Sequence, residues 1–153
     1  LGHARELARD LFEDVRATLL QLRQDQSDFG ELLERMLANI PYLKYSVAID
    51  SELLMLDARL ASCLLRVVQE SITNALKHSD ASRLSVTLSR DEQNGIRMEV
   101  QDNGRTAKTA DFGSGVGLAG LGERVRELGG VLQSGPTGQG FRLVAEFPED
   151  CLT

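Results

Sequence analysis

The sequence predicts an α+β fold in which helices cover one face of a sheet, forming a two-layer sandwich. Several segments carry apolar residues at spacings of three and four, the pattern of a helix with one buried side. Other segments alternate apolar and polar residues or flank turn sequences such as Asn94-Gly95, as strands do. Because the helical and strand segments come in separate runs, the pattern favours antiparallel strands beside helices.

Length and composition are those of a globular domain. The 153 residues suffice for one domain with a little left over, and 42% are hydrophobic. A net charge of −6 gives no electrostatic support for nucleic-acid binding, and no apolar run approaches the roughly 20 residues of a membrane span. Cys63 and Cys151 match no zinc or redox spacing, so we expect reduced thiols. Since the chain begins at Leu1, we expect a segment of a longer protein.

Two amphipathic helices are expected in the first forty residues. The first runs from His3 to about Arg23, with charged residues opposite an apolar stripe made of Leu7, Leu11, Val15, Thr18, Leu19 and Leu22. In the second, Asp28 can cap the N-terminus, Glu31 occupies the capping-box position, and Pro41 stops the helix. Its expected apolar face consists of Phe29, Leu32, Leu33, Met36, Leu37 and Ile40.

The remaining elements follow from the same patterns. Tyr45, Val47 and Ile49 alternate as in a strand, and a long helix is expected from about Asp57 to His78. Arg105 to Val116 is rich in glycine and polar residues, and we expect a loop there. The other expected elements, with approximate bounds, are strand Arg83–Arg90, strand Ile96–Asp102, helix Leu118–Leu128, strand Val131–Ser134 and strand Gly140–Phe147.

Polar residues share one side of the long helix. At 100° per residue, Glu70, Asn74 and Lys77 fall within roughly 60° of each other, nearly opposite the apolar side. Asn74 is a candidate Mg²⁺ ligand because magnesium prefers oxygen ligands, and Glu70 could hold a metal-bound water or accept a proton. Lys77 and His78 are candidate phosphate donors. Taken alone, a pair such as Glu70 and Asn74 is more often a solvated helix face.

Two further motifs complete a nucleotide site. Asp102 ends an apolar strand, where a carboxylate needs a partner such as the amino group of adenine, and Gly104 lets the backbone approach the base. Taken alone, Asp102-Asn103-Gly104 is also a common turn. The loop with Gly113, Gly115 and Gly117 then leads through Leu118 into a helix, whose N-terminal N–H groups favour phosphate.

The order and spacing of these motifs resemble the ATP-binding domain of bacterial sensor histidine kinases, in the gyrase, chaperone, kinase and MutL (GHKL) superfamily. The resemblance covers about residues 51–148, and Glu123-Arg124-Val125 and Leu128-Gly129-Gly130 are similar to the subclass of nitrate and lipid-fluidity sensors. It implies a Bergerat-type fold that binds ATP and Mg²⁺, with Asp102 as the residue that recognises the base. It also implies a response regulator as partner, and a cytoplasmic location, free or as part of a membrane-bound sensor.

The resemblance divides the chain into two parts. Residues 1–26 are more weakly similar to the second helix of a dimerisation and phosphotransfer hairpin, which implies a homodimer in the intact protein, and 27–153 form the ATP-binding domain. Glu70 would be the catalytic residue, with Asn74 as metal ligand. His3 is followed by Ala4-Arg5 and is no credible phosphoacceptor, so we expect the phosphorylated His outside this chain.

Departures from the family pattern keep a second hypothesis open. Thr106 replaces a frequent glycine and Phe141 a usual threonine, which puts nucleotide affinity in question. Both favour a nucleotide-binding regulatory module without kinase output, either a degenerate sensor or an anti-sigma-like protein. The long first helix disfavours that alternative. The cluster of Glu70, Asn74 and Asp102 argues against a third possibility, a purely structural dimer module.

Overall fold

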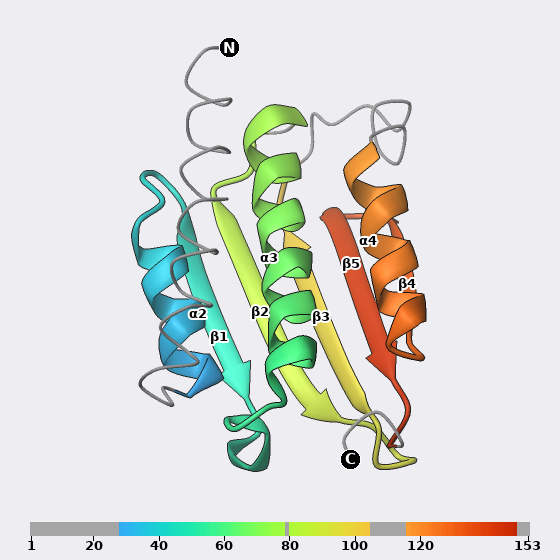
Figure 1. Cartoon of the computed structure of the whole chain (residues 1–153). Coiled ribbons are helices and arrows are strands. Elements are labelled where there is room, and N and C mark those ends of the chain that lie inside the picture. The colour runs from blue at the N-terminus through green and yellow to red at the C-terminus, as the bar shows by residue number, and fades with distance from the viewer. Residues whose placement is uncertain (1–27, 79, 105–115, 150–153) are drawn as a thin grey trace.

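The fold is a mixed five-stranded sheet covered on one face by helices (Figure 1). This computed structural model describes residues 28–78, 80–104 and 116–149, so the helix expected at 3–23 lies outside the described residues. The helices are α2 (Phe29–Ala38), η1 (Ser51–Leu53), α3 (Ala58–His78) and α4 (Val116–Glu127). The strands are β1 (Lys44–Ile49), β2 (Arg83–Arg90), β3 (Ile96–Asp102), β4 (Val131–Thr137) and β5 (Gly140–Phe147). The predicted two-layer α+β fold is confirmed.

The first described helix begins and ends as its sequence predicts. The Asp28 Oδ1 atom accepts a hydrogen bond of 2.8 Å from the Glu31 N–H, which satisfies one of the free donors of the first turn. All of the predicted apolar face is buried, and Ile40 lies just past the helix. This face packs α2 onto the core beside β1.

The prediction that the strands are all antiparallel is wrong for one pair. The sheet order is β1-β2-β3-β5-β4, and β1 runs parallel to β2, with Lys44 opposite Arg83 and Ile49 opposite Leu88. A parallel pair needs a long crossover, and η1 and α3 supply it. Alternation along a strand has the same period in both directions, so the sequence pattern could not distinguish them.

One hydrophobic core lies between the sheet and the helices. Along β2, exposed Arg83, Ser85 and Thr87 alternate with buried Leu84, Val86 and Leu88. The buried set points at the fully buried side of α3, which includes Leu64, Leu65, Val68 and Ile72. The opposite face of the sheet, here called the outer face, carries polar and charged residues on β1, β2 and β3.

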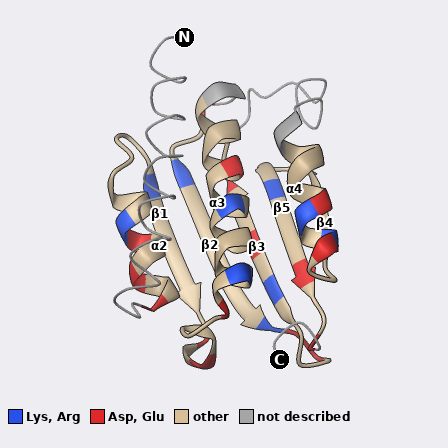
Figure 2. Cartoon of the chain, in the orientation of Figure 1, with Lys and Arg blue, Asp and Glu red and all other residues tan. Residues whose placement is uncertain are grey.

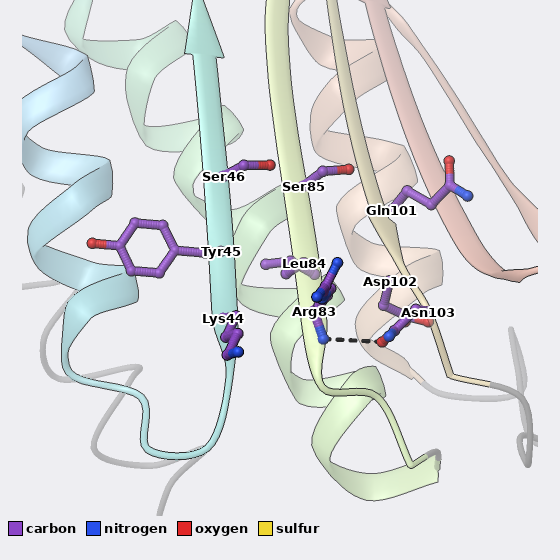
Figure 3. Close-up of a pocket in the computed structure, with 9 residues that line it drawn as sticks. All are labelled: Lys44, Tyr45, Ser46, Arg83, Leu84, Ser85, Gln101, Asp102 and Asn103. Atoms are coloured by element: carbon purple, nitrogen blue, oxygen red, sulfur yellow. Dashed lines mark hydrogen bonds between the residues drawn. The ribbon is translucent and has the colours of Figure 1, made fainter.

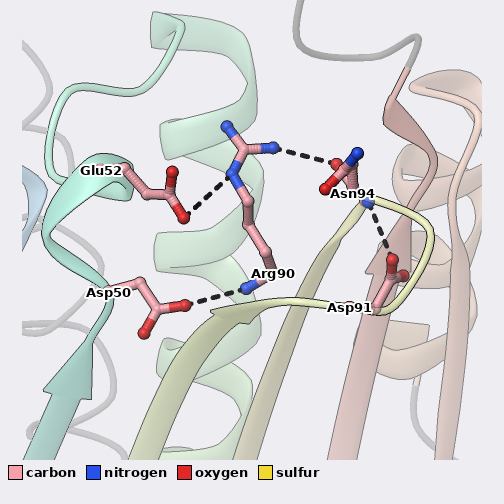
Figure 4. A network of polar contacts seen from close by, with 6 residues as sticks. Asp50, Glu52, Arg90, Asp91 and Asn94 are labelled. Carbon is pink, nitrogen blue, oxygen red and sulfur yellow. Dashed lines mark hydrogen bonds and ion pairs between the residues drawn. The ribbon is translucent and has the colours of Figure 1, made fainter.

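A polar network closes the end of the sheet at which β1 and β2 finish (Figure 4). The backbone N–H of Arg90 donates to Asp50 Oδ2. The side chain of Arg90 lies with its Nε 3.3 Å from Glu52 Oε1, and its guanidinium also donates to the Asn94 carbonyl. Asn94 has a left-handed φ of 63°, as the predicted hairpin turn requires. Arg90 thus ties the end of β1 to the β2–β3 turn, at the end away from the candidate site. No helix in the described ranges is long and apolar enough to cross a membrane.

Candidate nucleotide site

The elements that carry the predicted site residues meet at one end of the molecule. The C-terminal end of α3, the end of β3 and the start of α4 lie there, on the helix-covered side of the sheet (Figure 1). The antiparallel direction of β3 relative to β2 brings Asp102 back to that end, opposite Leu84. Motifs about thirty residues apart in the chain are therefore brought together.

Asp102 is buried, with 6% of its surface exposed. Its register partner Leu84 belongs to the core, so both side chains are on the helix side of the sheet. Oδ1 accepts N–H bonds from Gly104 (2.9 Å) and Phe141 (3.3 Å). The other carboxylate oxygen accepts none from the described residues. Burial raises the pKa of Asp102, against the lowering effect of these two N–H groups. One oxygen of a buried carboxylate thus remains available to a ligand's donor.

The start of β5 fixes this carboxylate, a contact that the sequence pattern did not predict. A Cβ on Gly140 would collide with the Asp102 carbonyl oxygen, so only glycine allows the two strands this close. The next residue, Phe141, is buried and supplies its N–H to Asp102. A main-chain donor leaves no trace in side-chain identity, and the sequence signal of the close approach is the glycine at position 140.

The side of α3 that carries Glu70 and Asn74 is less exposed than predicted. Asn74 is 8% exposed and Glu70 is half-buried, whereas the helical pattern placed both on a solvated face. α4 packs beside α3, so a second side of the helix is covered (Figure 1). Ser71 is buried as well, and its hydroxyl donates to the Val67 carbonyl at 2.9 Å.

The Asn74 amide has an unmet bonding requirement. Its Nδ2 is buried and has no hydrogen-bond partner within the described part of the chain. Native proteins seldom leave such donors unpaired, because each costs about 1–3 kcal/mol. An amide that lacks a partner near the end of α3 fits a site completed by a ligand with acceptor oxygens, such as phosphate.

The other predicted contacts are only partly described. Lys77 and His78 lie in the last turn of α3, but their side chains are outside the description. Gly113, Gly115 and Thr106 fall in the undescribed stretch 105–115. α4 begins at Val116, so Gly117 is inside its first turn, and the half-buried Leu118 packs against the core. The helix was expected from about Leu118, two residues after its observed start.

The residues present fit magnesium only together with a nucleotide. Within the described ranges, no group of three or more His, Cys, Asp or Glu side chains could hold a metal ion. Glu70 and Asn74 are one turn apart on α3, and this donor set suits a cation that takes its other ligands from phosphate and water.

Comparison with known proteins agrees with this geometry. The profile of the family described as histidine kinase-, DNA gyrase B-, and HSP90-like ATPase matches residues 61–150. Sensor histidine kinase LiaS of Bacillus subtilis (strain 168) is 30% identical over 153 residues, covering 94% of this chain and 42% of that protein. Nitrate/nitrite sensor protein NarQ of Escherichia coli (strain K12) is 30% identical, over 96% of this chain and 26% of that protein.

A solved structure supports the same fold. The blue-light activated histidine kinase of Erythrobacter litoralis, EL346, superimposes with a TM-score of 0.70 at 22% identity, covering 89% of this chain and 47% of that one. This chain spans less than half the length of these relatives. The relatives do not favour the regulatory alternative, and the fold is that of an ATP-binding catalytic domain of the sensor kinase type. With more than half of its residues matched by the profile, the chain belongs to the histidine kinase-, DNA gyrase B- and HSP90-like ATPase family.

Proposed function

We propose that this chain is the ATP-binding part of a sensor histidine kinase, and that it presents MgATP to a histidine outside residues 1–153. The observation that carries the proposal is that two buried polar side chains, Asp102 and Asn74, lie on elements that meet at one end of the molecule. One carboxylate oxygen of Asp102 is left to accept a hydrogen bond, and the Nδ2 group of Asn74 is left to donate one. The amino group of adenine is a suitable donor, and the phosphate oxygens are suitable acceptors.

Each residue would have a separate part in binding. Asp102 would accept a hydrogen bond from the adenine amino group. Gly104 has no side chain, so the adenine ring could lie close to the backbone there. Asn74 would hold Mg²⁺ through its amide oxygen, while Glu70 would orient a water or accept a proton. Mg²⁺, when bound, supplies charge neutralisation on the phosphates. Lys77, His78 and the glycines at 113, 115 and 117 would contact the phosphate chain.

The onward steps belong to the longer protein. The γ-phosphoryl group would pass to a histidine on a hairpin helix and then to a response regulator. Residues 1–26 would form the second helix of that hairpin and pair two subunits, with 27–153 as the separate nucleotide domain. The intact protein, or this part of it, would work in the cytoplasm.

Nucleotide titration of the 153-residue chain tests the proposal. Calorimetry should show ATP binding that strengthens with Mg²⁺, and labelled ATP should leave no acid-labile phosphate on His3. Asn74→Ala should weaken binding of MgATP much more than binding of metal-free ATP, because it removes a metal ligand. Equal losses for the two forms would contradict the metal role, and the absence of any nucleotide binding would overturn the proposed function.

Sedimentation tests the proposed subunit pairing separately. The full chain should self-associate as its concentration rises, whereas a chain starting at Asp28 should stay monomeric and still bind ATP. A monomeric full chain would contradict the role given to residues 1–26 and leave the nucleotide site untouched.

A further inference from the structure

A pocket lies on the outer face of the sheet, where β1 and β2 begin (Figure 3). Its volume is about 390 Å³, in the range of small-molecule sites. Side chains from neighbouring strands line it: Lys44 and Ser46 from β1, Arg83 and Ser85 from β2, and Gln101 from β3. The register places Lys44 beside Arg83 and Ser46 beside Ser85, while Gln101 faces Ser85 from the other side.

This pocket is rich in donors. Lysine and arginine only donate, and serine hydroxyls and the glutamine amide can donate as well. Asp102 also borders the pocket, but its carboxylate accepts the Gly104 and Phe141 N–H groups and lies on the same side of the sheet as its core partner Leu84. Among the residues that line the pocket, five side chains thus offer hydrogen-bond donors on the outer face and none presents a carboxylate there.

The two cationic side chains of the pocket are not held in ion pairs within the described ranges. Among the described residues, neither Lys44 nor Arg83 forms an ion pair, although the chain as a whole carries −6. Glu99 is the acid two positions before Gln101 on β3. It is already engaged by Arg97 at 3.6 Å and Arg142 at 3.3 Å. Figure 2 shows the basic starts of β1 and β2 side by side.

Asn103 fixes the backbone at the start of β2, the strand that carries Arg83. Its Oδ1 accepts the N–H groups of Ser82 and Arg83, each at 2.9 Å, and its Nδ2 donates to the Ser82 hydroxyl. These bonds join the end of β3 to the start of β2 at the rim of the pocket. The backbone from which the guanidinium extends is thus fixed before any ligand arrives, which lowers the ordering cost of binding.

We propose that this pocket binds a phosphate group carried by a small molecule. An arginine fork, an ammonium and hydroxyl groups are the donors that a phosphate with several acceptor oxygens can engage together. The site differs from the nucleotide site, because Gln101 and Asn103 face the outer side of β3 while Asp102 between them is buried on the helix side. A ligand of the outer pocket would therefore not occupy the ATP site.

Amide NMR titrations at constant ionic strength test this proposal. Inorganic phosphate and glycerol phosphate should give saturable shifts at Ser46, Ser85 and Gln101. The double variant Lys44→Gln/Arg83→Gln should weaken binding about tenfold or more, as expected when charge-assisted hydrogen bonds are lost. Arg97→Gln is the matched control, since it removes an outer-face arginine that is already paired with Glu99. It should leave phosphate binding unchanged.

Each other outcome overturns the proposal. Shifts that do not saturate, or that the control weakens as much as the double variant does, would mean only general attraction to a basic surface. Binding of a glutamate-rich peptide without binding of glycerol phosphate would make the face a protein-docking surface. Asp102→Asn should leave these shifts intact, so the result is independent of whether the chain binds ATP. Thermal melts of all variants confirm folding.

Discussion

At the scale of single residues, Asp102 is a carboxylate in surroundings that disfavour its charge. Burial raises its pKa above the usual 3.8. A group whose pKa rises on folding stabilises the fold below its unfolded pKa, and that contribution is lost as the pH rises through the folded value. We expect the ligand-free domain to lose this contribution as the pH climbs above about 4. ATP binding should show the opposite trend, because the base contact needs the ionised form.

Asp102→Asn is expected to separate stability from binding. The amide oxygen can keep the N–H bonds from Gly104 and Phe141 while the buried charge disappears, so the free energy of unfolding at pH 7 should not fall. ATP affinity should drop about five- to 150-fold, since a mispaired buried hydrogen bond costs about 1–3 kcal/mol. Denaturant unfolding and calorimetry measure the two effects. Unchanged ATP affinity would rule out the base-reading role.

Cys63 can report the opening of the contact between α3 and α4. It is a free, buried thiol, and burial raises its pKa to about 11 despite the nearby Arg124 and Arg66. Since the thiolate is the reactive form, alkylation at neutral pH should be slow until the domain unfolds. The measurement is mass spectrometry in a Cys151→Ser background, with and without denaturant. Rapid native-state labelling would show that the two helices separate readily.

At the scale of elements, the sequence predicted what local patterns determine. The boundaries of β2, β3 and β5 agree with the structure because turn sequences flank them. Two long-range features did not follow from it. The direction of β1 depends on its distant partner β2, and the burial of Asn74 was not predicted because the pattern of α3 places this residue opposite the apolar side.

Gly140→Ala should disturb the β3–β5 contact and the site together. Its Cβ would meet the Asp102 carbonyl, so the strands must shift, at a cost of about 1–3 kcal/mol or more. Gly138→Ala is the control in the same hairpin, because its Cβ would meet nothing within 4 Å. Chemical unfolding and ATP titration should both worsen for Gly140→Ala alone. Equal effects would place the sensitivity in the turn, and not at Asp102.

At the scale of the whole molecule, the domain is larger than the family match. The profile begins at residue 61, inside α3, yet α2 and β1 contribute to the same core. A chain starting at Ala61 should lack a cooperative melt. It loses the core residues Phe29, Leu33 and Met36, and without β1 it leaves β2 as an exposed edge strand. A chain starting at Asp28 should melt cooperatively. Circular dichroism compares them, and a cooperative melt of the shorter chain would place α2 and β1 outside the folding unit.

The parallel pairing of β1 with β2 also affects the order in which the strands pair during folding. β2–β3 and β4–β5 close across short turns, whereas Lys44 meets Arg83 only after η1 and α3 have brought the chain around. Contacts between distant segments form late because closing the loop costs entropy first. Val47→Ala should therefore speed unfolding and hardly slow folding in stopped-flow measurements, while Val86→Ala on β2 slows folding. β1 is thus expected to join the sheet only after the β2–β3 and β4–β5 hairpins have formed.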